Sequence, residues 1–324
     1  MPFSSLIGNE RIKKLLKRLI SDSRVGQGLI FAGPRGVGKY RFALALAQAL
    51  NCERSAGGDA CGECPTCHRI TAGEHLDVRS VTPDGPFIKI AQTRELSLEA
   101  QFRPYEGRHR VIIVDDADRL RIEASNSILK TLEEPPDLSL IVLVTSKPYA
   151  LLETIRSRCQ RINFGPLSAT ELESYLLGTD RPRDKARLLA RLARGSIGTA
   201  LGIDLDEYLE KRRLMMELVE ALFVQHDTVR LIKAAEYLGK KMEREDFITH
   251  IDALMTLLSD LFRLKLGGDV ESITNLDVAD RLSRTGASVT TEAVTVVVER
   301  LEQVLLGLNR NLNRQIAMEA ALIM

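Results

Sequence analysis

The chain has 324 residues, of which 44% are hydrophobic and 27% are charged, and its formal net charge is +1. This composition is typical of a globular protein of two or three domains, and it excludes nucleic-acid binding driven by overall charge. The sequence has no run of about 18 apolar residues, and its first residues lack a signal-peptide pattern. We therefore expect a cytoplasmic protein without a membrane span, whose contacts with DNA come from a local surface or from partners.

The N-terminal half alternates short apolar runs with helical patterns. Residues 11–20 predict an amphipathic helix, whose basic face either contacts DNA or is simply solvated. Buried strands are predicted at 28–32, 111–114, 140–144 and 162–164. Helical patterns lie between them, as at residues 122–132, so we expect a parallel sheet with helices on both faces.

A glycine-rich loop follows the first predicted strand. Gly33, Gly38 and Lys39 fit the G-x-x-x-x-G-K frame that wraps backbone N–H groups around nucleotide phosphates, and Gly36 lies within it. The next residue is Tyr40, where a Ser or Thr hydroxyl would hold Mg²⁺. Its phenol oxygen lies about 6 Å from the backbone, beyond the reach of those hydroxyls. We expect a phosphate loop that binds ATP or ADP with one magnesium ligand missing.

Two acids follow the predicted strand at 111–114. Asp115 and Asp116 belong at the same sheet edge as the phosphate loop, where aspartates of NTPases hold Mg²⁺ and a neighbouring acid polarises water. The alternative is an acidic helix start, which the helix dipole favours. Asp116 is also one methylene shorter than the Glu of an efficient hydrolase.

Four of the five cysteines lie in one short segment with the spacing C-x8-C-x2-C-x2-C: Cys52, Cys61, Cys64 and Cys67. Gly62 and Pro65 suit the tight turns in which successive thiolates converge on one ion. Four thiolates form a closed tetrahedral site, so we predict structural Zn²⁺. Free thiols, replacement of one ligand by His68 and an iron–sulfur cluster are the alternatives.

Strand patterns end at about residue 167. Ser168 and Glu171 have capping-box spacing, and residues 186–194 predict a second helix. Further amphipathic helices are predicted at 208–224, 229–238, 244–266 and 291–309. The C-terminal part is thus expected to be all-α.

Together these residues resemble the bacterial clamp-loader branch of the AAA+ superfamily, over essentially the whole chain. The resemblance rests on the phosphate loop, the cysteine segment and residues 111–120, 128–136, 157–159, 195–201 and 311–315. Residues 129–136 and 157–159 are specific for clamp loaders, whereas the phosphate loop fits many NTPases. The resemblance implies a RecA-like AAA+ domain at 1–166 with a zinc module at about 52–68, a helical lid at 167–205 and a helical collar at 206–324.

The resemblance also implies partners. In this family five subunits join through their collars, and motor subunits (gamma/tau), with a delta subunit, use ATP to open a ring-shaped sliding clamp and load it at primed DNA. A rigid member presents the arginine of its Ser-Arg-Cys motif to the ATP of an adjacent motor subunit. Arg158 has that place here, although for the residue alone an ordinary surface cation is the alternative.

Three departures distinguish this chain from a motor subunit. They are Tyr40, Asp116 and Thr199, the last of which stands where the family has an arginine that contacts the terminal phosphate. We therefore expect a replication scaffold that does not hydrolyse ATP and is not itself a polymerase, although it belongs to a nucleotidyl-transferring holoenzyme. The alternatives are a clamp-loader motor ATPase that holds its metal through water, and an AAA+ adaptor in DNA repair.

Overall fold

The computed structural model describes residues 1–134, 138–308 and 312–323, and the chain divides into two compact units. Unit 1 comprises Met1–Arg183 and Ala193–Gly202, and unit 2 comprises Asp184–Leu192 and Ile203–Met324. Each unit has its own hydrophobic core. Pro135, Pro136 and Asn311, which belong to the clamp-loader stretches, and Asn309 of the last predicted helix lie outside the described residues.

Unit 1 is built on a five-stranded parallel sheet with the strand order β2-β3-β4-β1-β5. The strands are β1 (Gly28–Ala32), β2 (Val78–Val81), β3 (Arg110–Val114), β4 (Ser139–Thr145) and β5 (Gln160–Asn163). Every residue of β1, β3 and β4 is buried, which explains their continuous apolar sequences. These three strands confirm the prediction, and β5 begins two residues earlier than expected.

The edge strand β2 is not predicted by the sequence pattern. Its sequence is Val-Arg-Ser-Val, and Arg79 and Ser80 are exposed, so no apolar run marks it. Its extended conformation comes from pairing with β3, in which Val78 lies opposite Val111. Ser80 of this strand accepts a hydrogen bond from Tyr40, the residue that follows Lys39.

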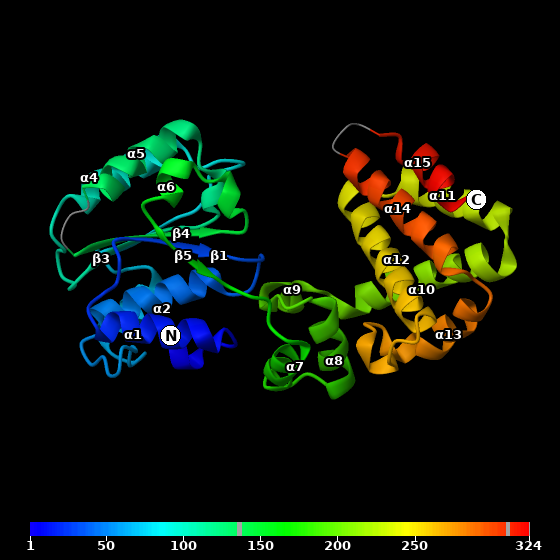
Figure 1. Cartoon of the computed structure of the whole chain (residues 1–324), viewed down its shortest axis with the longest axis horizontal. Helices are drawn as coiled ribbons and strands as arrows, with labels where there is room; N and C mark the ends of the chain where they lie inside the picture. Colours follow the sequence, from blue (N-terminus) through cyan, green and yellow to red (C-terminus); the bar gives the residue numbers. More distant parts are fainter. Residues whose placement is uncertain (135–137, 309–311, 324) are drawn as a thin grey trace. The chain divides into compact units, whose positions relative to one another are not determined.

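Helices cover both faces of the sheet, as predicted (Figure 1). Leu29 and Phe31 of β1 pack with α1 (Glu10–Ser21) and α2 (Lys39–Asn51), whereas Ile30 and Ala32 point to the opposite face. That second face packs against α4 (Ile90–Ala100), α5 (Ile122–Glu133) and α6 (Glu153–Arg156). The alternation of side chains along β1 thus divides the core of unit 1 into two layers.

The rest of the described chain is helical. Unit 1 ends with α7 (Ala169–Leu177), where Ser168 and Glu171 form the expected capping box, and α9 (Ile197–Gly202). The other α-helices of the C-terminal half are α8 (Arg183–Leu192), α10 (Leu205–Glu220), α11 (Thr228–Lys241), α12 (Arg244–Lys265), α13 (Ala279–Ala287), α14 (Thr291–Gly307) and α15 (Arg314–Leu322). The short elements are the 3-10 helices η1 (Phe3–Ser5), η2 (Ala117–Arg119), η3 (Pro148–Ala150), η5 (Val270–Ser272) and η6 (Leu276–Val278), and the π-helical turn η4 (Ala221–Gln225). None of the described helices has the length and apolar character needed to cross a membrane.

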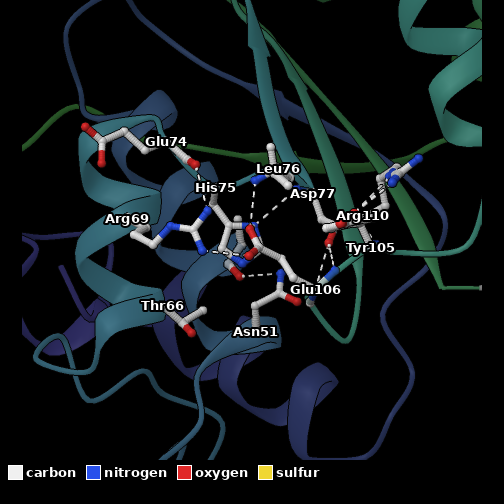
Figure 2. Close-up of polar contacts among 12 residues, drawn as sticks. Asn51, Thr66, Arg69, Glu74, His75, Leu76, Asp77, Tyr105, Glu106 and Arg110 are labelled. Carbon is white, nitrogen blue, oxygen red and sulfur yellow. Dashed lines mark hydrogen bonds and ion pairs between the residues drawn. The ribbon is translucent and has the colours of Figure 1, made fainter.

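A buried carboxylate organises the loop that leads into β3. Asp77 is inaccessible to solvent and accepts hydrogen bonds from the backbone N–H groups of Tyr105, Glu106 and Gly107, each at 2.8 Å (Figure 2). Its Oδ1 also accepts from Nη2 of Arg110, the first residue of β3, at 2.7 Å. Burial alone would raise the pKa of Asp77, but these hydrogen bonds outweigh it and lower the pKa to about 2.

The same loop is tied to the helices beside it. Asn51, the last residue of α2, accepts hydrogen bonds from the N–H groups of Arg108 and His109. The Glu106 carboxylate accepts from Arg69 of α3 (Pro65–Ala72) at 2.6 Å (Figure 2). The start of β3 is therefore held by side chains from α2, α3 and the segment before β2.

We expect Asp77→Asn to destabilise the protein by about 3–5 kcal/mol, because it leaves the Arg110 guanidinium buried without its charge partner. Urea unfolding measures the change. The folded-state pKa of Asp77 is depressed from 3.8 to about 2, so its carboxylate stabilises the fold above about pH 4. The difference between the two proteins should therefore shrink as the pH falls toward 2. Asp84→Asn removes an exposed, solvent-screened ion pair with Lys89 and should leave the free energy of unfolding nearly unchanged; a loss as large as that of Asp77→Asn would contradict the interpretation.

Candidate functional site

The phosphate loop connects β1 to α2 at the carboxyl edge of the sheet. Gly38 is the N-cap of α2 and has φ +94°, a conformation that L side chains rarely adopt. Gly36 has φ +70°, and a Cβ there would lie 2.1 Å from Ser196 Oγ. The loop therefore needs glycine at both positions, and it directs the first N–H groups of α2 toward the space in front of the sheet. Such groups favour an anion.

A cavity of about 410 Å³ opens in front of this loop. Its lining brings together six residues predicted from the sequence: Gly36, Gly38, Lys39, Tyr40, Asp115 and Asp116. The structure adds residues that were not among the predicted site residues: Arg35, Arg41, Val144, Thr145, Ile197, Gly198 and Leu201. Gly33 contributes its carbonyl oxygen, which accepts a hydrogen bond from Lys39 Nζ at 2.8 Å.

Lys39 is folded back on its own loop. Its side-chain nitrogen donates to the carbonyl oxygens of Gly33 and Pro34, at 2.8 and 2.6 Å, and the residue is only 7% exposed. Burial lowers the pKa of Lys39, and the nearby carboxylates, chiefly Asp115, act in the opposite direction. A bound phosphate would have to exchange with these two carbonyl oxygens.

Tyr40 is held away from the position of a metal-binding hydroxyl. Its Oη donates a hydrogen bond at 2.9 Å to Oγ of Ser80 on β2. The phenol therefore links α2 to the edge of the sheet. No neighbouring sequence pattern indicates this contact, since the two residues are 40 positions apart.

The two acids after β3 have different surroundings. Burial raises the pKa of Asp115, whose Oδ1 accepts a hydrogen bond from the Asp116 N–H at 3.0 Å. Oδ2 of Asp116 lies 3.6 Å from Nη2 of Arg35 and 3.5 Å from Nε of Arg119. Two guanidinium groups thus lie beside the carboxylate that stands where a hydrolase has its catalytic acid.

The first turn of α9 contacts the phosphate loop directly. The N–H of Gly198 donates to the carbonyl oxygen of Gly36 at 3.0 Å. Thr199 does not line the cavity, because its hydroxyl donates to Ser196 Oγ at 2.8 Å. The position that differs from the family pattern therefore contributes no cation to this cavity.

The four predicted cysteine ligands converge. The Sγ atoms of Cys52, Cys61, Cys64 and Cys67 all lie within 4.8 Å of one another. Backbone N–H groups donate to three of these sulfurs, at 3.3 to 3.5 Å. Gly62 allows the tight turn with φ +77°, and Cys64 caps α3.

The thiols of this cluster differ in acidity. The backbone N–H of Glu63 is the main cause that lowers the pKa of Cys61 to about 6, whereas burial raises the pKa of Cys67. His68 is exposed and does not belong to the group of four sulfurs. A donor set of four converging sulfurs fits a tetrahedral Zn²⁺ site that would join the segment after α2 to α3.

Arg158 lies outside the phosphate-loop cavity, on the segment between α6 and β5. Its Nη2 is 2.9 Å from Glu133 Oε1, and its Nη1 donates to the carbonyl oxygen of Thr154 at 3.0 Å. The Arg158 side chain is 37% exposed. Cys159 is separate from the four-cysteine cluster, and burial raises the pKa of its thiol to about 12.

Comparisons with known proteins agree with this arrangement. The family model described as "DNA polymerase III, delta subunit" matches residues 8–168. The DNA polymerase III subunit delta' of Bacillus subtilis is 30% identical over 315 residues, which are 97% of this chain and 95% of that protein. The chain belongs to the clamp-loader subunits of DNA polymerase III. This clamp-loader subunit has the RecA-like AAA+ fold with a helical C-terminal region that the sequence predicted.

Sequence similarity to the tau/gamma subunits covers a smaller part of the chain. The DNA polymerase III subunit tau/gamma of Haemophilus influenzae is 33% identical over 207 residues, 62% of this chain and 30% of that protein. Among solved structures, a gamma subunit-related protein of Thermotoga maritima has a TM-score of 0.39 at 19% identity, covering 95% of this chain and 96% of that one. Family membership favours the clamp loader over a repair adaptor.

We expect freshly purified, reduced protein to contain one Zn²⁺ per chain, and Cys64→Ser to lose it with a fall of roughly 5 °C in the unfolding midpoint. Metal analysis and thermal unfolding measure both effects. Cys159→Ala is the matched control and should keep its zinc, since this thiol lies outside the cluster. Wild-type protein without zinc, or iron in its place, would contradict the assignment.

Proposed function

We propose that the chain is the delta prime subunit of the clamp loader, a scaffold that does not hydrolyse ATP and donates Arg158 to a neighbouring motor subunit. The observation that supports this most directly is the state of the phosphate-loop cavity. The Tyr40 hydroxyl is bonded to Ser80, and the Asp116 carboxylate is paired with Arg35 and Arg119. Tyr40 therefore supplies no hydroxyl for Mg²⁺, and Asp116 lies beside two cations at the place where a hydrolase has the acid that activates water.

The similarity to B. subtilis delta', which extends over nearly the whole length of both chains, supports the same assignment. The proposed subunit has three parts: a RecA-like domain at 1–166 with the zinc module at about 52–68, a lid at 167–205 and a collar at 206–324. The partners are the gamma/tau motor subunits and delta in a cytoplasmic hetero-pentamer. Through that complex the chain acts on the sliding clamp and primed DNA.

In this proposal the phosphate loop keeps a binding role without catalysis. Gly36, Gly38 and the first N–H groups of α2 would surround a phosphate group, and Lys39 would turn from its loop carbonyl oxygens toward it. The cations Arg35 and Arg41 also line the cavity. An anion therefore finds positive charge there without a metal ion.

We expect the isolated chain to bind ADP equally well in Mg²⁺ and in EDTA, and to hydrolyse no ATP above background. The reason is that Tyr40 directs its hydroxyl to Ser80 and supplies no magnesium ligand, while Asp116, which stands in place of a catalytic Glu, lies beside Arg35. Calorimetry and a phosphate-release assay measure the two quantities. The alternative is a motor ATPase, and the presence of Lys39 and the glycines favours it. A motor ATPase would bind ADP more tightly in Mg²⁺ than in EDTA. It would also hydrolyse ATP, and Lys39→Ala would abolish that hydrolysis.

We expect Arg158→Ala to leave the chain folded and assembled but to lower ATP turnover at the adjacent motor subunit by on the order of 10³-fold. The complex is reconstituted with clamp and primed DNA, and single-turnover ATP hydrolysis is followed. Arg121→Ala removes an exposed guanidinium that lies over the Phe87 ring and should have no effect. Normal turnover with Arg158→Ala would refute the donation of this arginine.

A further inference from the structure

The guanidinium of Arg158 already has partners within its own subunit. Nη2 is 2.9 Å from a carboxylate oxygen of Glu133. Nη1 donates to the Thr154 carbonyl oxygen at 3.0 Å and lies 3.4 Å from Ser157 Oγ. Both terminal nitrogens of the guanidinium therefore already have partners. These are the two nitrogens that would bind a phosphate group in a bidentate interaction.

The position of Glu133 is electrostatically unfavourable for its own helix. It is the last residue of α5, where the ends of the backbone dipoles carry partial negative charge and a carboxylate is destabilising. Arg158 compensates for that charge from outside the helix. The acid thus contributes less to helix stability than to holding the guanidinium.

The ion pair is also weak enough to exchange. The side chains of Arg158 and Glu133 are 37% and 48% exposed, so solvent screens their attraction. A nucleotide phosphate offers a guanidinium two charged oxygens and a stronger, bidentate interaction. The same N–H groups therefore have a weak partner in their own subunit and would gain a stronger one from a neighbour's nucleotide.

We propose that Glu133 is a positioning residue that holds Arg158 back until a neighbour's nucleotide displaces its carboxylate. This inference rests on the proposed function, because it assumes that Arg158 acts on the ATP of another subunit. Glu133 and the terminal phosphate compete for the same guanidinium. The carboxylate consequently raises the ATP concentration that the adjacent site needs for turnover.

The test is Glu133→Gln in the reconstituted clamp loader with clamp and primed DNA. Glutamine keeps the shape of the side chain and removes its charge. The ATP concentration for half-maximal turnover should fall about two- to fivefold, with kcat changed less than about twofold. The difference from wild type should shrink as ionic strength rises, which a purely structural role would not produce.

Two further variants make the result specific. Glu134→Gln removes the next acid, which forms no ion pair with Arg158 in the described part of the chain, and should change nothing. Glu133→Asp keeps the charge on a shorter side chain and should stay closer to wild type than Glu133→Gln. Thermal unfolding of each variant confirms that it is folded.

The outcomes separate the two proposals. If Arg158→Ala leaves turnover unchanged, the donated arginine itself is refuted. If Arg158→Ala lowers turnover but Glu133→Gln leaves half-saturation unchanged or raises it, only the role of Glu133 is overturned. In the Arg158→Ala background, Glu133→Gln should have no effect; a persisting effect would show that Glu133 does not act through Arg158.

Discussion

The functional surface of this protein depends on the parallel pairing of β1 with β4 and of β4 with β3. That pairing brings the carboxyl ends of three strands to one edge of the sheet. The phosphate loop leaves β1 there, Asp115 leaves β3, and Thr145 at the end of β4 donates a hydrogen bond to Asp118 at 2.7 Å. Asp77 stabilises the same arrangement from the opposite end of β3, through Arg110 and the loop before it.

At that edge the polar side chains form hydrogen bonds and ion pairs with other groups of the protein. Lys39 binds its own loop, Tyr40 binds Ser80, and Asp116 lies between two arginines. An NTPase needs at this place a hydroxyl and a carboxylate that are free to coordinate Mg²⁺. The cavity keeps positive charge and helix N–H groups for an anion, so its chemistry suits binding more than hydrolysis.

The cysteine cluster and Arg158, also in unit 1, are positioned by different kinds of interaction. The four cysteines are close in sequence, and short turns with N–H···S hydrogen bonds are enough to make their sulfurs converge. Arg158, in contrast, is exposed, and it is held by a carboxylate at the end of another helix. In the proposed function, this weakly held cation is the group that acts on a neighbouring subunit.

The sequence by itself determined the features that lie within consecutive residues. Apolar runs predicted the three central strands, the glycine spacing predicted the phosphate loop, and the cysteine spacing predicted a four-sulfur site. In each case the residues that form the feature lie close together in the sequence, so the pattern alone is enough to predict it. The predicted helix ranges did not include α13 or α15, which are nine-residue helices, and α13 has many polar residues.

Only the tertiary structure decided what the site residues touch. Strand β2 is half polar and became a strand through pairing with β3, and this pairing is what brings Ser80 to Tyr40. The contacts of Asp116 with Arg35 and of Glu133 with Arg158 likewise join separate segments. No single segment encodes them, since they depend on the register of the sheet and on the helices packed over it.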